Sequence, residues 1–176
     1  MNTIGEPVPP QPTTLGLDVG RKRVGMALYQ PDQGAVVPLP AIARAGKRAE
    51  QQVLHLIEKH SIGVIVVGVP LSASDQQTEQ AQDIEAFVHR LERRCQVPFD
   101  HCDEFLSSEE AKELLGITGN PDREVREGGF IDTVAACVIL QRYLNRKSLH
   151  PTVELGSLRR EVAALLRSNK SGFRSR

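Results

Sequence analysis

The spacing of apolar and polar residues changes along the chain. Residues 15–19 and 24–29 are short apolar runs joined by the tetrapeptide 20–23, which begins with Gly20, and a third run covers residues 36–42. Short runs bounded by turns that contain glycine or proline predict three antiparallel strands. From Val53 the apolar residues recur at intervals of three and four, which predicts an amphipathic helix that ends near residue 60.

The later pattern alternates between strands and helices. Residues 62–69 are almost continuously apolar and β-branched, as in a central parallel strand covered on both faces, and residues 97–103 predict another strand. Helical spacing returns from Thr78, and a capping box at residues 107–110 begins a short helix. Residues 116–129, with four glycines, predict a mobile loop, whereas residues 131–144 are apolar nearly all round and predict a buried helix.

This order of elements predicts an α/β protein. One mixed five-stranded sheet, antiparallel in its first three strands and parallel afterwards, is flanked by helices joined through right-handed crossovers. We expect a disordered, proline-rich lead-in over residues 1–13, one domain over residues 14–147, and a basic, partly helical extension over residues 148–176.

Composition narrows the class of protein. A hydrophobic content of 40% and a charged content of 25% are ordinary for a soluble globular protein. No apolar run approaches the roughly 20 residues that span a bilayer, so we expect no membrane association, and the first residues lack the features of a signal peptide. Three cysteines without a C-x-x-C pair argue against a disulfide framework or zinc ribbon and favour a cytoplasmic protein.

The net charge of zero hides two regions of opposite charge. The 22 Lys+Arg residues balance 22 Asp+Glu, which excludes a simple polycation that binds nucleic acid by bulk charge. Residues 1–144 carry 14 Lys+Arg against 20 Asp+Glu, however, and residues 145–176 carry 8 against 2. We predict that this basic tail supplies nucleic-acid affinity that the acidic core lacks, the alternative being a solvated tail without such a role.

Acidic residues occupy unusual places in the predicted elements. Asp18 lies inside an apolar strand, Asp103 and Glu104 lie where the strand 97–103 ends, and Asp132 lies in the first turn of the buried helix. Buried carboxylates are costly unless they are paired, hydrogen-bonded or bound to a cation. Converging carboxylates suit Mg²⁺ or Mn²⁺, and two ions about 4 Å apart can activate water and stabilise the leaving oxygen of a phosphodiester.

Each of these acids also has a structural interpretation. Asp18 could accept hydrogen bonds from the adjacent turn, and Asp132 could complement the positive end of its helix. Asp103 and Glu104 point to opposite faces of a strand, so only one of them can face a metal, and the sequence leaves the choice open. The basic residues Arg21, Lys22 and Arg23 form either a solvated hairpin tip or contacts to phosphates.

Four motifs identify a resemblance to a known family, and they span about residues 14–145. They are Asp18-x-Gly20-x-Lys22-Arg23-x-Gly25-x-Ala27, Val66-Val67-Gly68-Val69-Pro70, Asp103-Glu104, and Ile131-Asp132-x-x-Ala135-Ala136. The chain resembles the YqgF/RuvX family of the RNase H-like superfamily. Members of that family are described as Holliday-junction resolvases and as nucleases that process the 5′ end of pre-16S rRNA.

The resemblance implies a metal-dependent endonuclease. Asp18, Glu104 and Asp132 take the catalytic and metal-binding positions, with Asp103 as neighbour or substitute, and two Mg²⁺ or Mn²⁺ ions are the implied cofactors. The implied partners are structured RNA such as pre-rRNA, branched DNA, or a ribosomal particle. The alternatives are a Holliday-junction resolvase and an RNA- or ribosome-binding module that does not cut; we expect a monomer or weak dimer.

Two departures from the family pattern remove positive charge near the predicted site. Phe105 stands where the family commonly has arginine, and Gly128, Gly129 and Phe130 stand where a basic residue usually precedes the helix aspartate. Arg123 and Arg126, both in the predicted loop 116–129, are the candidates that compensate. Together with Lys22, Arg23 and Arg21 they complete the expected set of nucleic-acid-binding residues.

Overall fold

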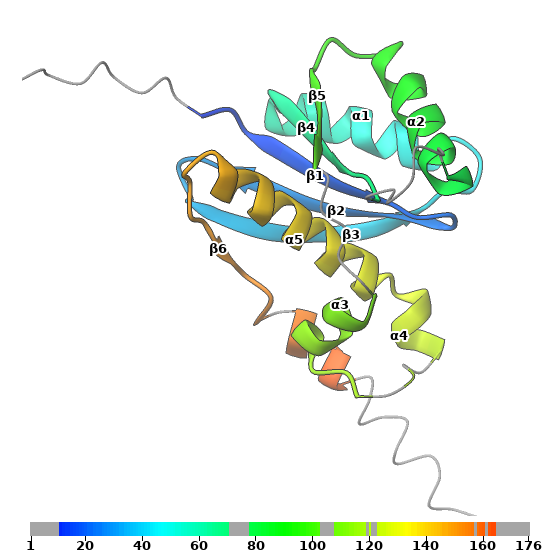
Figure 1. Ribbon diagram of the computed structural model, residues 1–176, viewed down its shortest axis with the longest axis vertical. Helices are drawn as coiled ribbons and strands as arrows, with labels where there is room; N and C mark the ends of the chain where they lie inside the picture. The colour runs from blue at the N-terminus through cyan, green and yellow to red at the C-terminus, as the bar shows by residue number, and fades with distance from the viewer. Residues whose placement is uncertain are drawn as a thin grey trace, which may run out of the picture.

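A computed structural model describes residues 11–70, 78–102, 108–118, 120, 123–156, 158–160 and 162–164. Its elements, drawn in Figure 1, follow the predicted order. They are β1 (Thr14–Val19), β2 (Arg23–Gln30), β3 (Ala35–Ala43), α1 (Arg48–His60), β4 (Val64–Gly68), α2 (Glu79–Glu92), β5 (Phe99–Cys102), α3 (Ser108–Leu115), α4 (Arg123–Glu127), α5 (Phe130–Arg146) and β6 (Thr152–Val153).

The strands form one mixed sheet in the order β5-β4-β1-β2-β3-β6. The β1–β2 and β2–β3 pairs are antiparallel, whereas β4 is parallel to both β1 and β5. This confirms the predicted α/β class, a mixed sheet flanked by helices. The predicted count of five strands is one too low, because β6 adds two residues in parallel to Ala35 and Val36 of β3. A strand of two residues is too short to show any period in the sequence.

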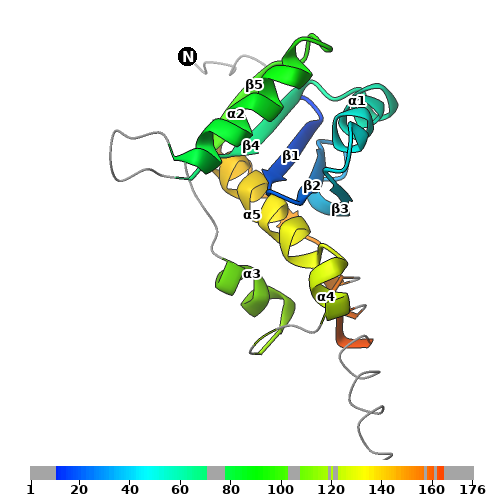
Figure 2. The ribbon, with the colours of Figure 1, turned by 90° about the vertical axis from the view of Figure 1, so that its right-hand side faces the viewer.

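The two faces of the sheet carry different helices. Helices α1 and α2 cover one face and α5 crosses the other (Figure 2). Leu17 and Val19 of β1 belong to the core under α1 and α2, whereas the alternate residues of β4 and β5, Val66 and Cys102, belong to the core under α5. Because side chains alternate along a strand, Asp18 faces α5.

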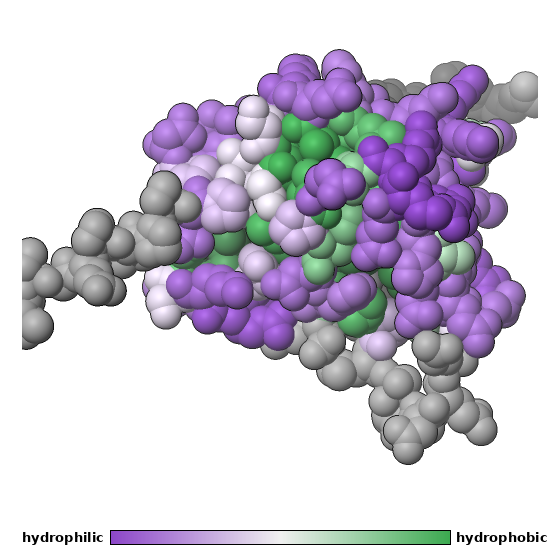
Figure 3. All heavy atoms as spheres, turned by 90° about the horizontal axis from the view of Figure 1, so that it is seen from above, coloured by the Kyte–Doolittle hydropathy of each residue, from purple (hydrophilic) through white to green (hydrophobic). Residues whose placement is uncertain are grey.

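The core under α1 and α2 is not completely covered. On the side of the molecule that carries α1, α2 and β5, apolar side chains reach the surface within a rim of polar ones (Figure 3). The partly buried apolar residues that border this core are Leu39, Ile42, Leu54, Ile57, Val69, Val97 and Phe99. In the part of the chain that the structure describes, no helix is both long and apolar enough to cross a membrane.

The prediction that residues 116–129 form a mobile loop is partly wrong, because this segment contains helix α4. Val125 of this helix is fully buried in the α5 core, and Arg123 pairs with Glu127 one turn later, with 2.7 Å between Nε and Oε1. Burial of one side and an i,i+4 ion pair on the other stabilise a short helix that propensity alone does not predict.

Part of the basic tail packs against the domain. Residues 156, 158–160 and 162–164 are helical, Leu155 and Val162 are buried, and Leu158 packs beside them on the α5 core. Arg159 and Arg160 are exposed, and Arg159 Nε donates a hydrogen bond to the carbonyl oxygen of Leu114, 2.7 Å away. This segment therefore contributes apolar packing as well as positive charge.

Candidate active site

Asp18 and Asp132 are brought together by a glycine. Asp18 is paired with Gly25 across the β1–β2 hairpin, and the first turn of α5 rests on that glycine. A Cβ at position 25 would lie 1.9 Å from the carbonyl oxygen of Asp132. Only a residue without a side chain allows the helix to approach β2 this closely. The glycine at position 25 of the hairpin motif thus has a direct structural reason.

Both carboxyl groups have raised pKa values. Burial first, and then the negative charge of Asp132, raise the pKa of Asp18 from 3.8 to about 7. Burial also raises the pKa of Asp132, while the positive charge of Arg23 and a backbone hydrogen bond oppose the rise. Two desolvated carboxyl groups of like charge are destabilised when both are ionised, and a cation between them would relieve that repulsion.

The carboxyl ends of three parallel strands lie at the same edge. Leu17 of β1 is level with Val67 of β4, and Gly68 of β4 is level with Cys102 of β5. Asp18 therefore comes one residue after the last position of β1 that is paired with β4, and β4 separates it from the end of β5. Asp103 and Glu104, which directly follow Cys102, lie outside the described residues. Within the described ranges, no group of three or more His, Cys, Asp or Glu residues could hold a metal ion.

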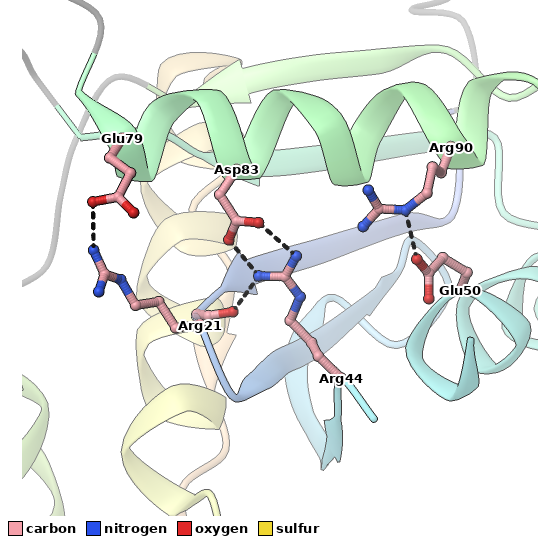
Figure 4. Close-up of polar contacts among 7 residues, drawn as sticks. Arg21, Arg44, Glu50, Glu79, Asp83 and Arg90 are labelled. Atoms are coloured by element: carbon pink, nitrogen blue, oxygen red, sulfur yellow. Dashed lines mark hydrogen bonds and ion pairs between the residues drawn. The ribbon is translucent and has the colours of Figure 1, made fainter. Parts of the chain in front are cut away.

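The hairpin tip, residues 20–23, carries three basic side chains, and each has different surroundings. The Arg23 side chain lies beside the carboxylates, since its charge acts on Asp132 and its Cδ would be 3.2 Å from a Cβ at position 129. Lys22 is exposed. Arg21 instead pairs with Glu79 of α2, with 3.3 Å between Nη2 and Oε2 (Figure 4).

Of the two arginines in the predicted loop 116–129, the structure describes the side chain of one. Arg123 lies on α4 and pairs with Glu127. The Arg126 side chain lies outside the described residues. A direct role of either arginine at the carboxylates therefore stays a prediction.

A second cluster, which the sequence did not reveal, joins the hairpin to α2. Arg44, just after β3, donates from Nη1 to the Gly20 carbonyl oxygen at 2.8 Å and binds both carboxylate oxygens of Asp83 at 2.5 and 3.0 Å. Its guanidinium lies 5.3 Å from the centre of the Phe87 ring. The partners are 24 to 43 positions apart in the chain, and no local pattern links them.

The fold and the paired carboxylates together define the class of protein. Two carboxyl groups with raised pKa values, brought together where the first hairpin of a mixed sheet meets the buried helix, are the kind of acidic site that a nuclease requires. The chain belongs to the RuvX family: residues 12–146 match the family described as "RuvX: Holliday junction resolvase".

Relatives of similar length support the family. The chain is 36% identical over 133 residues to the protein of Maridesulfovibrio salexigens named "Putative pre-16S rRNA nuclease", covering 75% of this chain and 97% of the relative. It is 33% identical over 138 residues to the protein of the same name from Chloroflexus aurantiacus, covering 78% and 89%.

Two solved structures of lower identity also match the chain over most of its length. The Thermus thermophilus RuvC structure in complex with a Holliday junction substrate has 13% identity and a TM-score of 0.47, covering 80% of this chain and 99% of that one. The Fowlpox virus resolvase bound to Holliday junction DNA has 10% identity and a TM-score of 0.45, covering 78% and 99%.

Proposed function

We propose that this protein is a divalent-metal-dependent endonuclease that hydrolyses phosphodiester bonds in structured RNA, with the 5′ end of pre-16S rRNA as its substrate. The observation that carries the proposal is the Asp18–Asp132 pair, in which burial and the negative charge of Asp132 raise the pKa of Asp18 to about 7. The substrate comes from the names of the relatives, two of which are 36% and 33% identical to this chain. The reaction and its substrate would place the protein in the cytoplasm.

The residues present fit a hard divalent cation. Asp18 and Asp132 offer only carboxylate oxygens, which Mg²⁺ and Mn²⁺ prefer over softer ligands. A bound cation would also offset the repulsion that raises the pKa of Asp18, so binding near neutral pH should release a proton. When bound, one or two such ions would supply an activated water and stabilise the leaving oxygen.

A third carboxylate is needed, and we assign it to Glu104 rather than Asp103. Cys102 at the end of β5 belongs to the core under α5, the face to which Asp18 and Asp132 also belong. Residues 103 and 104 lie outside the described residues; a continuation of the side-chain alternation of β5 would put residue 104 on the face of Cys102 and residue 103 on the opposite one. Glu104→Gln should therefore abolish cleavage, whereas Asp103→Asn should reduce it less, and the reverse result would exchange the two roles.

The basic residues of the hairpin tip would contact the nucleic-acid backbone. Arg23 lies beside Asp132 and can neutralise a phosphate next to the carboxylates, and Lys22 is exposed one residue away. Arg21 and Arg123 would extend this surface once they exchange Glu79 and Glu127 for phosphates, and Arg126 would add a further positive charge. Contacts of this kind set affinity and make it depend on salt, without reading the base sequence.

The alternative substrate is a four-way DNA junction, which the family description favours. A third possibility, binding to RNA or a ribosomal particle without cutting, is favoured by Phe105 in place of the family arginine. One experiment separates the three: precursor rRNA and a synthetic four-way junction are each incubated with the protein, with Mn²⁺ or with EDTA. Faster Mn²⁺-dependent cleavage of the RNA supports the proposal. Preferred junction cleavage, or binding without cleavage of either, would replace it with the corresponding alternative.

A further inference from the structure

Helix α2 is attached to the hairpin tip through charged side chains. Glu79 and Asp83 lie one turn apart on α2 and face Arg21 and Arg44 in Figure 4, while Arg90 reaches Glu50 of α1 at 2.8 Å. A cavity of about 350 Å³ is lined by Arg21, Arg44, Glu79 and Asp83. The tip is therefore supported from α2 by directional hydrogen bonds, which fix its position more closely than apolar packing would.

Arg44 contacts two carbonyl groups of the tip. Its backbone N–H donates to the carbonyl oxygen of Lys22 at 2.9 Å, and its Nη1 donates to that of Gly20 at 2.8 Å. The Gly20 N–H in turn donates to the carbonyl oxygen of Arg23 at 2.9 Å, which closes the turn. One residue outside the hairpin thus holds both the first and the third residue of the tip.

The Arg44 side chain is itself tightly constrained. It is only 12% exposed, it binds Asp83 through both terminal nitrogens, and it stacks on Phe87. The hydrogen bond from Arg44 lowers the pKa of Asp83, so this carboxyl stays ionised and paired at neutral pH. A bidentate, stacked guanidinium cannot be replaced by a lysine ammonium with the same geometry.

We propose that Arg44 is a positioning residue for nucleic-acid binding: through the Gly20 and Lys22 carbonyls it fixes the hairpin tip, and with it the place from which the exposed Lys22 side chain reaches the substrate backbone. This inference rests on the proposed function. Arg44 has no direct role in the chemistry, and its own charge is already paired with Asp83. Its loss should weaken binding of the substrate backbone more than it slows the chemical step.

Arg90 provides a matched control. Its guanidinium also stacks on Phe87, 5.7 Å from the ring centre, and it also forms an ion pair at 2.8 Å, but with Glu50 of α1 rather than with an acid beside the hairpin. Arg44→Met and Arg90→Met therefore each remove one positive charge and one guanidinium group that lies against the Phe87 ring of α2. Only Arg44→Met removes a hydrogen bond to the tip, the one from Nη1 to the Gly20 carbonyl oxygen, while the backbone bond to the Lys22 carbonyl oxygen remains.

The experiment measures binding and turnover with a labelled precursor rRNA fragment and a labelled four-way junction. We expect Arg44→Met to raise Kd in EDTA and KM in Mn²⁺ about tenfold, which corresponds to about 1.4 kcal/mol, with kcat changed less than threefold. Arg44→Lys should be intermediate, and Arg90→Met should stay within twofold of wild type. Amide hydrogen exchange of residues 20–24 should accelerate in Arg44→Met alone.

A double-mutant cycle with Lys22→Ala isolates the positioning role. If Arg44 acts through Lys22, Arg44→Met should change Kd less than twofold when Lys22 is already alanine. A tenfold effect that persists in the Lys22→Ala background, or an Arg44→Met variant no weaker than Arg90→Met, overturns the inference while the nuclease proposal stands. Wild-type protein that binds neither probe overturns the proposed function and this inference together.

Discussion

Asp18→Asn should stabilise the metal-free protein above neutral pH. The pKa of Asp18 is raised from 3.8 to about 7 by burial and by the charge of Asp132. A carboxyl with a higher pKa in the folded state holds its proton more tightly there, so stability falls as the pH rises from about 4 to about 7. At 1.36 kcal/mol per pKa unit, full ionisation costs at most about 4 kcal/mol. Because Asp18 keeps partial contact with solvent, we expect about 2 kcal/mol.

The assay is urea unfolding in EDTA at pH 3 and at pH 8. Asp18→Asn should be about 2 kcal/mol more stable than wild type at pH 8 and nearly equal to it at pH 3, which is below the pKa of 3.8 that the carboxyl has when unfolded, because a neutral amide removes the penalty that exists only when Asp18 is ionised. Asp32→Asn, an exposed acid in the β2–β3 turn, is the matched control and should change stability at neither pH.

Metal supplies a second comparison in the same experiment. Saturating Mn²⁺ should stabilise wild type, since a ligand that binds only the folded state adds to its stability, and should stabilise Asp18→Asn far less. An Asp18→Asn variant that is less stable than wild type at pH 8, or a difference that is the same at both pH values, would refute this reasoning. The residue would then be a structural hydrogen-bond acceptor.

Three further substitutions test other parts of the account. Gly25→Ala should destabilise the fold by more than about 3 kcal/mol, since its Cβ would lie 1.9 Å from the Asp132 carbonyl oxygen; unfolding within about 0.5 kcal/mol of wild type would contradict this. Phe105→Arg, which restores the family residue, should lower KM for precursor rRNA, and an unchanged KM would show that the lost charge is immaterial. Arg160→Gln should reduce the salt dependence of RNA binding by about one counterion, whereas an unchanged slope would exclude this part of the tail.

The structure also changes how the role of the tail should be tested. Deleting residues 149–176 would remove Leu155 and Val162, which are buried in the α5 core, and would therefore disturb the fold as well as the charge. Arg160 is exposed, so Arg160→Gln changes charge without exposing that core. A cavity of about 460 Å³ beside it is lined by β3, β6 and the start of the helical tail.

The elements around Asp18 and Asp132 could be predicted because their signals are local. A charged residue in an otherwise apolar strand, and another in the first turn of an apolar helix, are visible in windows of a few residues. The glycine opposite Asp18 is visible as well, but its role as the contact point for α5 depends on a contact between positions 25 and 132.

Other features depend on contacts that no local window contains. The Arg44–Asp83 pair joins residues 39 positions apart, and Arg44 lies in a segment whose composition is unremarkable. Helix α4 is stabilised by burial of Val125 in the α5 core, which outweighs the flanking glycines. Strand β6 exists because Thr152 and Val153 meet the edge of β3, where the backbone groups of an edge strand are open to pairing.

The most direct test of the central claim is Mn²⁺-dependent cleavage of precursor rRNA by wild type and by the Asp132→Asn variant, with Asp32→Asn as control. We predict that wild type and the control cleave with Mn²⁺ and not with EDTA. Asp132→Asn should retain its fold and its affinity for RNA while losing at least 99% of the cleavage rate, which is about 2.7 kcal/mol of transition-state stabilisation. Cleavage by folded Asp132→Asn at the wild-type rate would contradict the assignment of this carboxylate pair as the active site.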